Sequence, residues 1–500
     1  MNHRDALTYH PAMSASGGME KPVERSLREF LGRLERDHPE QIVHVGEPVD
    51  PRRFEVSAVL QHLERRRKYP LVVFDHPLDL TGAPSAFPLV TNVFATRARC
   101  ALALGLAAGD AGLPLALAYA AREEAARRDG ARWAPEPVAE RDAPVKAVVR
   151  RGDEVDLRSL PIPRQHEMDG GPYLDMTCVM RDRDTGAYNT AFLRNQFKGP
   201  RKLGLHMSPR QNWQIARKHE AKGEPTPVAI VVGHPAFHIG ALNVAPFGTD
   251  DYAVAGAVAG APLRVVPSAT WGEAFMVPAD AELVIEGLVP AGVREVEGPF
   301  GEFPGTYGPQ RLRWVVEVTA LQHRRDAMHQ MVFSGHPDTW VLGSFPKEGS
   351  LYNRIKGVVP SVTAVHLPTS GVGRFHCYIS LDKRVEGEQK QAALIALGEC
   401  DFVKHVFLVD ADIDVFREEE VLWAVATRVQ ADTGVDVIRG AKGNALDPSQ
   451  VHDTAGAKMI IDATKPLDRP FESRIAVPEE ALARVDLDRL ISPDAQGRLA

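Results

Sequence analysis

The sequence predicts an α/β fold (α+β in the wider sense) of three regions, the middle one rich in β-strands. With 500 residues, the chain is too long for one ordinary domain. Short apolar runs alternate with alanine-rich helical stretches over 41–130, a pattern typical of an α/β domain. Short β-forming runs between Gly and Pro turns follow, and long helical patterns return afterwards. We place the region boundaries at 1–136, 137–330 and 331–500.

The first region is expected to open with an amphipathic helix. Ser26 and Glu29 form a capping-box pattern, and apolar residues follow at helical spacing. Residues 1–23 are polar and rich in Gly and Ser, so we expect a loose tail there. The run 71–74 is apolar throughout and has the length of a short strand.

The central region consists of short β-forming runs, such as 227–233, 261–267 and 281–289, separated by Gly and Pro turns. One helical pattern interrupts them near 213–222. Many short strands with frequent turns are typical of a barrel or of a small sandwich, and the pattern leaves both open.

The third region alternates helices with a strand. Helical periodicity covers 387–397 and 418–430, and the apolar run 405–409 lies between them. This alternation predicts a second α/β domain.

Composition and charge argue against several classes of protein. Lys and Arg number 59 against 66 Asp and Glu, a net charge of −7, which argues against nucleic-acid binding. The four cysteines form no CxxC pair, so neither a zinc ribbon nor a disulfide framework is indicated. The N-terminus lacks a signal-peptide core, and Asp110 and Pro114 interrupt the most apolar stretch, 101–121. We expect a cytoplasmic protein with no membrane partner.

The segment Glu-Gly-Pro-Phe-Gly-Glu at 297–302 is the densest candidate site. Carboxylates five residues apart face opposite sides of a straight strand, but Pro299 and the two glycines allow a bend that turns Glu297 and Glu302 into one pocket. Paired carboxylates repel each other, which raises the pKa of one and yields a proton donor at neutral pH. A solvated turn with two surface glutamates is the alternative.

Arg194 ends the β-rich run 189–194. A buried arginine needs a carboxylate partner or an anionic ligand, whereas an exposed arginine on a surface strand needs neither. His206 is a further candidate, although a lone histidine is more often structural. Asp250 and Asp251 can supply oxygen ligands to a hard metal ion, although paired aspartates in a turn are more often only solvated.

In order along the chain, these segments resemble the UbiD family of decarboxylases, which use prenylated FMN. The resemblance covers about residues 24–470. The family's N-terminal part is similar to SLREFLGRLERD and EPVDPRRFEVSAVLQHL, and its cofactor-binding barrel to LPIPRQHEMDGGPYLDMTCVMRDRDTG and NTAFLR. Its most specific stretch matches PADAELVIEG and EGPFGEFPGTYG, and its C-terminal part resembles KMIIDATKP. All these segments together, rather than any one alone, favour the functional interpretations.

The resemblance implies a split β-barrel that binds the flavin, an N-terminal α/β domain and a C-terminal α/β oligomerisation domain. It implies a homodimer or homohexamer, supplied with cofactor by a flavin prenyltransferase. The implied reaction is reversible, non-oxidative decarboxylation of an aromatic, heteroaromatic or α,β-unsaturated acid, with prenylated FMN as the electron sink. One alternative is a non-catalytic flavin-binding or assembly subunit. Hydrolysis by Glu297 and Glu302 without a flavin is another.

The resemblance also implies roles for single residues. Arg194 stands where the family's arginine binds the substrate carboxylate, Glu297 where a glutamate pairs with that arginine, and Glu302 where an acid transfers the proton. Lys383 lies near a family lysine that approaches the cofactor phosphate, with Lys390 as the neighbouring candidate. The residues implied to bind the cofactor are Asn189, Arg194, Gln211 and Lys383.

The implied metal site departs from the family pattern. Asn189 matches an asparagine that binds Mn²⁺ or Mg²⁺ at the cofactor phosphate, with K⁺ nearby. The family's glutamate ligand corresponds to Asp251, which is one methylene shorter. The family's histidine ligand falls near Gln211 or Asn212, neither of which is a histidine, and His206 is the candidate substitute.

Overall fold

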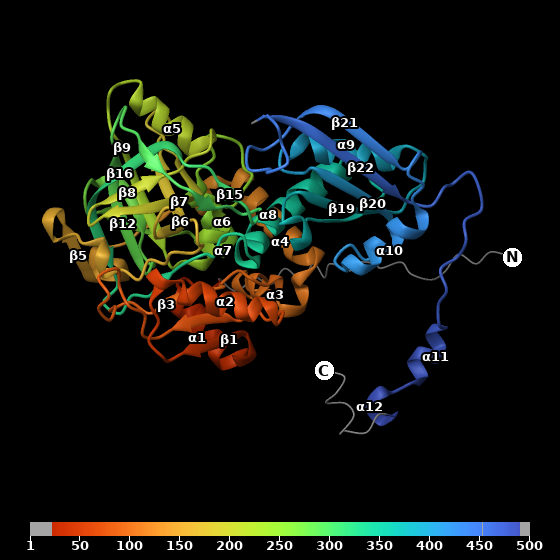
Figure 1. Ribbon diagram of the computed structural model, residues 1–500, viewed down its shortest axis with the longest axis horizontal. Helices are drawn as coiled ribbons and strands as arrows, with labels where there is room; N and C mark the ends of the chain where they lie inside the picture. Colours follow the sequence, from red (N-terminus) through yellow and green to blue (C-terminus); the bar gives the residue numbers. More distant parts are fainter. Residues whose placement is uncertain (1–22, 453, 491–500) are drawn as a thin grey trace.

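Three bodies of secondary structure follow one another along the chain, and Figure 1 shows them side by side. The computed structural model describes residues 23–452 and 454–490. The predicted loose tail, 1–23, therefore lies outside the described residues except for Val23, which is buried. The mixed α/β fold predicted from the sequence is confirmed.

The N-terminal body is a sheet of order β1-β2-β3-β17 with helices packed on it. Its elements are α1 (Leu27–Asp37), β1 (Ile42–Val45), α2 (Glu55–Arg65), β2 (Leu71–Phe74), β3 (Leu89–Thr91), α3 (Arg97–Ala103), α4 (Leu113–Arg128) and β17 (His329–Gln330). The hydroxyl of Ser26 caps α1 by accepting a hydrogen bond from the Glu29 N–H, at 3.3 Å, as the capping pattern predicts. The last strand, β17, comes from far downstream in the sequence, so the central region completes this sheet.

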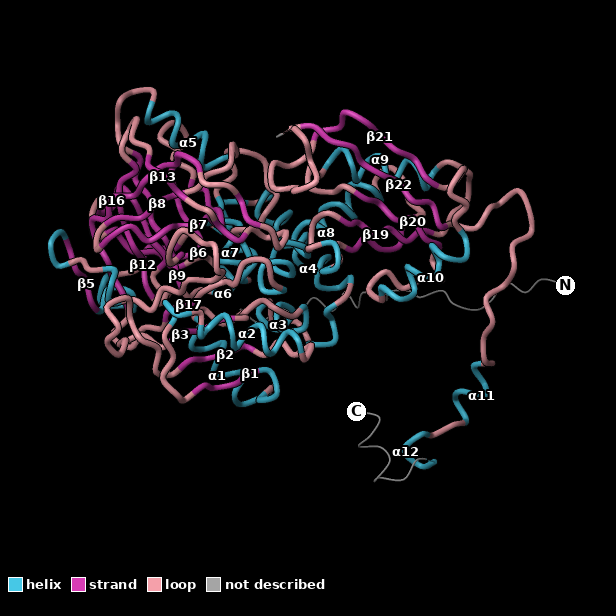
Figure 2. The backbone as a smooth tube through the Cα atoms, in the orientation of Figure 1, coloured by secondary structure: helices cyan, strands magenta, loops and turns pink. Residues whose placement is uncertain are grey.

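The central body contains a closed antiparallel barrel, which decides between the two architectures that the pattern left open. Strand β12 pairs with β9 on one side and with β16 on the other, and β6, β7 and β8 complete the ring. These strands are β6 (Tyr173–Arg181), β7 (Tyr188–Gly199), β8 (Lys202–Leu205), β9 (Thr226–Val232), β12 (Leu283–Val289) and β16 (Arg311–His323). Closure leaves no free edge in this ring, and Figure 2 shows the strands gathered in one region.

Short strands and helices surround the barrel. The strands are β4 (Glu136–Pro137), β5 (Val148–Arg151), β10 (Arg264–Ser268), β11 (Gly272–Pro278), β13 (Glu295–Glu297), β14 (Phe300–Gly301) and β15 (Tyr307–Gly308), and the helices are α5 (Gln211–Glu220), α6 (Pro235–Gly240) and α7 (Asp251–Ala259). Helix α5 lies where the sequence predicts one. Helices α6 and α7 were not predicted, because residues on every side of them are buried and a helix buried all round has no amphipathic pattern.

The C-terminal body is a sheet of order β18-β19-β20-β22-β21 with helices against it. Its elements are α8 (Pro337–Lys356), β18 (Val362–His366), β19 (His376–Leu381), α9 (Glu388–Glu399), β20 (His405–Asp410), α10 (Glu418–Arg428), β21 (Val435–Lys442) and β22 (Ala455–Ala463). Helix α8 packs closely on α4, since a Cβ at Gly349 would lie 2.1 Å from the Ala116 carbonyl oxygen. Helices α11 (Glu479–Arg484) and α12 (Leu487–Leu490) stand apart from this body (Figure 1). No described helix is long and apolar enough to cross a membrane.

Candidate active site

Arg194, on barrel strand β7, is held by contacts with two glutamates. Its Nε and Nη2 donate to the two carboxylate oxygens of Glu297, both at 2.9 Å, and its Nη1 contacts Glu302. Glu297 is fully buried, and Arg194 and Glu302 are 8% and 9% exposed. The structure therefore brings the three predicted residues together in the interior, and the surface-turn alternative does not describe these glutamates.

A sharp bend between β13 and β14 turns both carboxylates toward the arginine. Gly298 has a φ of +91°, a conformation that favours glycine. The neighbouring loop pins the bend, because the Gly170 N–H donates to the Pro299 carbonyl and the Gly301 N–H to the Asp169 carboxylate, each at 2.8 Å. Hydrogen bonds donated by backbone N–H groups therefore hold the bend that positions the two glutamates.

Two glycines make room for the groups around Glu302. A Cβ at Gly301 would lie 2.3 Å from the ring of His166, and one at Gly308 would lie 2.9 Å from the Glu302 carboxylate. The ring of Phe300 packs against the Arg194 guanidinium, with 4.9 Å between the guanidinium carbon and the ring centroid. Close packing therefore requires glycine at positions 301 and 308, in addition to the glycine that the bend requires at 298.

Tyr173, which sequence reasoning missed, holds the pair of Arg194 and Glu297 through a hydrogen bond to Glu297. Its hydroxyl donates to Glu297 at 3.0 Å, and its ring lies 4.5 Å from that of Phe300. Burial, with a contribution from Glu297, raises the pKa of Tyr173 well above its ordinary value, so the hydroxyl stays a donor. A tyrosine in a β-rich run carries no functional signal of its own, since its partner lies far away in the sequence.

The residues predicted to bind a metal ion divide between two places. Asn189 donates to Asn212 at 2.7 Å, and the Asp251 carboxylate accepts from the N–H and the hydroxyl of Thr190 at 2.7 and 2.9 Å. Burial raises the pKa of Asp251 to about 7, against the effect of the Thr190 hydrogen bonds. These amide and carboxylate oxygens are the donor type that Mg²⁺ and Mn²⁺ prefer. Among the described residues no group of three or more His, Cys, Asp or Glu could hold a metal, so an ion here depends on the amides.

His206 lies near Arg194 rather than near Asn189. Its N–H donates to the Arg194 carbonyl at 3.2 Å, and its Nδ1 accepts from Arg313 at 2.9 Å. Asn189 lies five residues back along β7, roughly 17 Å at the rise of a strand. Burial and the nearby arginines lower the pKa of His206 to about 2, so the ring is neutral. The structure does not bring His206 together with Asn189.

A cavity of about 570 Å³ borders the strand segment that precedes Arg194, although Arg194, Glu297 and Glu302 are not among its lining residues. Its volume is within the usual range for small-molecule sites. The barrel lines it with 189–193, which directly precede Arg194, and with Gln211 and Asn212 of α5. The C-terminal body contributes Lys347, Arg374 and Phe402 to the opposite wall. Neither predicted phosphate-site lysine lines the cavity: Lys383 is paired with Glu386 at 3.0 Å and Lys390 with Asp436 at 2.9 Å.

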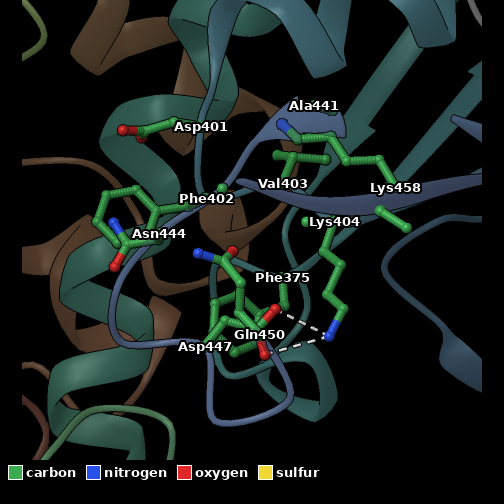
Figure 3. Close-up of a pocket in the computed structure, with 13 residues that line it drawn as sticks. Phe375, Asp401, Phe402, Val403, Lys404, Ala441, Asn444, Asp447, Gln450 and Lys458 are labelled. Carbon is green, nitrogen blue, oxygen red and sulfur yellow. Dashed lines mark hydrogen bonds and ion pairs between the residues drawn. The ribbon is translucent and has the colours of Figure 1, made fainter. Parts of the chain in front are cut away.

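A second hollow in the C-terminal body is too small for a ligand site. Its volume is about 10 Å³. In Figure 3 the Lys404 ammonium, which is on its wall, is joined to Asp447, at 2.9 Å. The same view shows Asp401 and Phe402 in the segment that also borders the large cavity. The 570 Å³ cavity is the candidate site, because it borders the strand segment next to Arg194.

Comparison with protein families finds three consecutive matches. Residues 33–112 match the UbiD_N family, the 3-octaprenyl-4-hydroxybenzoate carboxy-lyase N-terminal domain. Residues 136–337 match the Rift-related domain of the same carboxy-lyase, UbiD, and 340–463 its C-terminal domain, UbiD_C. The Rift-related match contains the barrel, Arg194 and both glutamates.

Named relatives and solved structures are similar to this chain over most of its length. An anhydromevalonate phosphate decarboxylase of Methanothermobacter thermautotrophicus is 34% identical over 63% of this chain and 75% of its own. A phenolic acid decarboxylase of Sedimentibacter hydroxybenzoicus is 30% identical over 92% and 96%. The UbiD-class enzyme HmfF from Pelotomaculum thermopropionicum, solved with FMN, has a TM-score of 0.84 and 36% identity over 93% of this chain and 100% of its own. An evolved dimeric form of it, solved with prFMN, has a TM-score of 0.81 and 34% identity over 94% and 100%.

Proposed function

The chain belongs to the UbiD family of carboxy-lyases, and from this premise we propose that it catalyses reversible, non-oxidative decarboxylation of an aromatic, heteroaromatic or α,β-unsaturated acid with prenylated FMN. One observation carries the proposal. Arg194, fixed by Glu297 and in contact with Glu302, directly follows the strand segment that lines a flavin-sized cavity. When bound, prenylated FMN supplies the electron sink that an sp² carbon needs as CO₂ leaves.

Arg194 binds the substrate carboxylate through one edge of its guanidinium. Glu297 occupies Nε and one N–H of Nη2, so Nη1 and the second N–H of Nη2 form the remaining edge. A carboxylate that enters the cavity loses its hydration, and two parallel hydrogen bonds from this edge replace it. The position of the arginine thereby orients the bond to CO₂.

Glu302 delivers the proton. It contacts Nη1 of Arg194, the group that the substrate carboxylate also needs. The carbon that loses CO₂ needs a proton donor, and Glu302 is the acidic group next to the ligand-binding edge of Arg194. A protonated Glu302 beside the reacting carbon then replaces CO₂ with a proton, and in the carboxylation direction it takes that proton back.

We further propose that Asn189 and Asp251 hold Mn²⁺ or Mg²⁺ near the flavin phosphate, with K⁺ nearby. The oxygen donors of both residues support this assignment, as does the position of Asn189 on the cavity wall. Gln211, whose amide donates to the Ala245 carbonyl at 3.4 Å, would contact the flavin from the same wall.

We also propose a homodimer or homohexamer that receives its cofactor from a flavin prenyltransferase in the cytoplasm. The arm that carries α11 supports self-association, because Ile475 is 96% and Leu490 68% exposed there. Four free cysteines support a reducing compartment. A non-catalytic subunit is less well supported, because Arg194, Glu297 and Glu302 are all present and joined.

The test is a CO₂-release screen on protein produced together with a flavin prenyltransferase. Absorbance first establishes that the prenylated flavin is bound, and aryl, heteroaryl and α,β-unsaturated acids are then assayed for CO₂ release and for deuterium exchange. We expect release from at least one class, and none from the matched Arg194→Ala protein. A fully loaded wild-type enzyme that neither releases CO₂ nor exchanges deuterium with any of these acids would contradict the proposal.

A further inference from the structure

A third acidic side chain, Asp175, lies beside the pair of Arg194 and Glu297. Strands β6 and β7 pair so that Asp175 is directly opposite Arg194. Directly opposite residues of an antiparallel pair have their side chains on one face, with roughly 5 Å between the Cβ atoms. Tyr173, two residues earlier, is on the same face, and its hydroxyl donates to Glu297. Asp175 is therefore part of the group around Arg194, although the proposed reaction gives it no role.

In the described part of the chain, Asp175 has no cationic partner. Its Oδ2 accepts a hydrogen bond from the side-chain amide of Gln165, at 3.0 Å, whereas its Oδ1 is buried without a partner. The guanidinium opposite is already occupied, because Arg194 donates to Glu297 and contacts Glu302. A buried carboxylate oxygen that accepts no hydrogen bond is costly, so this geometry favours the protonated carboxyl.

Gln165 cannot turn to offer Asp175 a second donor. Its amide oxygen accepts from the Ser334 N–H at 2.9 Å, and its amide nitrogen also donates to the Val332 carbonyl at 3.4 Å. These two contacts fix which end of the amide faces Asp175, and they leave it one N–H to donate there.

The charged groups that act on Asp175 are Arg194, Glu297 and Asp169. Two of the three are acidic, and Arg194 already serves the other glutamates. The Asp169 carboxylate accepts two backbone N–H groups, each at 2.8 Å, and such bonds favour its charged form. Burial first, and then the charge of Asp169, raise the pKa of the Asp175 carboxyl well above its ordinary value. The electrostatics therefore agree with the unpartnered oxygen.

We propose that Asp175 is a positioning residue that admits the substrate carboxylate to Arg194 only while it carries a proton, and that its ionised form pairs with Arg194 instead. This inference rests on the proposed function and adds a pH-dependent control to it. Protonated Asp175 leaves the free edge of the guanidinium to the substrate. Ionised Asp175 competes for that edge, because opposite charges directly across a strand pair attract each other. The site therefore closes as the pH rises, and the proton is exchanged with solvent.

The experiment compares Asp175 with Asp175→Asn, whose amide has the shape of a protonated carboxyl and does not ionise. The probe is benzoate, and its dissociation constant is measured by calorimetry on holoenzyme that carries Glu302→Gln in both arms. This background prevents turnover and removes the titration of Glu302. At about pH 6 both proteins should bind benzoate equally, whereas by about pH 9 the protein with Asp175 should lose roughly 10-fold or more, since each pH unit above a pKa is tenfold. The Asn protein should keep its affinity.

Three outcomes would overturn the proposal. They are a parallel fall in affinity in both proteins, no fall in either, and weaker binding by the Asn protein at the lower pH. If neither protein bound benzoate at any pH, Arg194 would not be a carboxylate site and the proposed function would fail with it.

Thermal unfolding of the full-length proteins tests the charge of Asp175 without any ligand. A raised folded pKa makes wild-type stability fall as the pH rises above the unfolded value. Asp175→Asn should therefore unfold at a higher temperature than wild type, and by a larger margin at about pH 8 than at about pH 6. Asp169→Asn is the matched control and should unfold at a lower temperature, because both of its oxygens accept backbone N–H groups. An Asp175→Asn protein no more stable than wild type at either pH would show that Asp175 is ionised in the fold and would overturn the proposal.

Discussion

Arg194 and Glu297 lie 103 residues apart in the sequence and are joined by two parallel hydrogen bonds of 2.9 Å. This fork-to-fork arrangement is among the strongest that an arginine and a carboxylate make. It fixes the plane of the guanidinium and leaves one edge, next to Glu302, for a ligand.

Arg194→Lys should lose most activity while keeping the fold and the flavin. Lysine retains the charge but not the planar fork, so we expect kcat/KM to fall roughly 10²-fold or more. Arg194→Ala should lose nearly all activity and also some stability, because Glu297 is then buried without its cationic partner. Steady-state kinetics with flavin absorbance checks both variants. A lysine variant with wild-type kcat/KM would remove Arg194 from carboxylate binding.

Glu302→Gln should stop proton transfer without releasing the flavin. Glutamine has nearly the same shape but carries no acidic proton, and the loss of a general acid typically costs roughly 10²–10⁴-fold. Turnover and solvent-deuterium exchange into the product should fall together. If the variant still exchanges deuterium at the wild-type rate, another group transfers the proton.

Tyr173→Phe should lower kcat/KM roughly 10- to 100-fold, because a hydrogen bond to a charged group contributes about 1.5–3 kcal/mol. Tyrosine here positions Glu297 rather than touching substrate, so we expect the loss in kcat to exceed any change in KM. The matched control is Tyr252→Phe, which removes a buried hydroxyl that donates to the Met276 carbonyl at 2.9 Å. Similar losses in both variants would indicate a general stability effect instead.

Elemental analysis of the wild-type holoenzyme should find Mn²⁺ or Mg²⁺. Asp251→Asn should lower the metal content, because it removes the one carboxylate of the proposed set. The matched control is Asp250→Asn, since Asp250 caps α7 by accepting from the Tyr252 N–H at 2.9 Å. Zinc alone in the wild type, or full flavin occupancy with no metal, would count against the assignment.

Because of His206, the free energy of unfolding should decrease as the pH falls. Its folded pKa is about 2 against an ordinary 6.5, so below pH 6.5 the unfolded chain binds a proton that the folded one does not. The stability is therefore complete above pH 6.5 and is lost as the pH falls toward 2. Between pH 7 and pH 5 the contribution is about 2 kcal/mol. Urea unfolding of wild type and His206→Gln at both pH values measures it, and a pH-independent difference would exclude a neutral buried ring.

The sequence predicts the parts of this site whose partners lie nearby in the chain. The bend at 297–302 follows from its glycines and proline, and the resemblance assigns Arg194 to the same pocket. Tyr173 could not be predicted, because its partner, Glu297, is distant in sequence. Helix α7 could not be predicted either, because it is buried on every side and its residues show no amphipathic pattern. Lys347 lies in a helix next to Glu348, and only the tertiary fold shows which of the two faces the cavity.

The cavity has walls from two separate bodies, and this division has a consequence for engineering and evolution. The strand segment next to Arg194 comes from the barrel, whereas Lys347 and Arg374 come from the C-terminal body. A change in the C-terminal body therefore alters one wall of the cavity and leaves the pair of Arg194 and Glu297 in place. A chimera that joins this barrel to the C-terminal portion of a relative should show the relative's preference among acid substrates while retaining the native reaction.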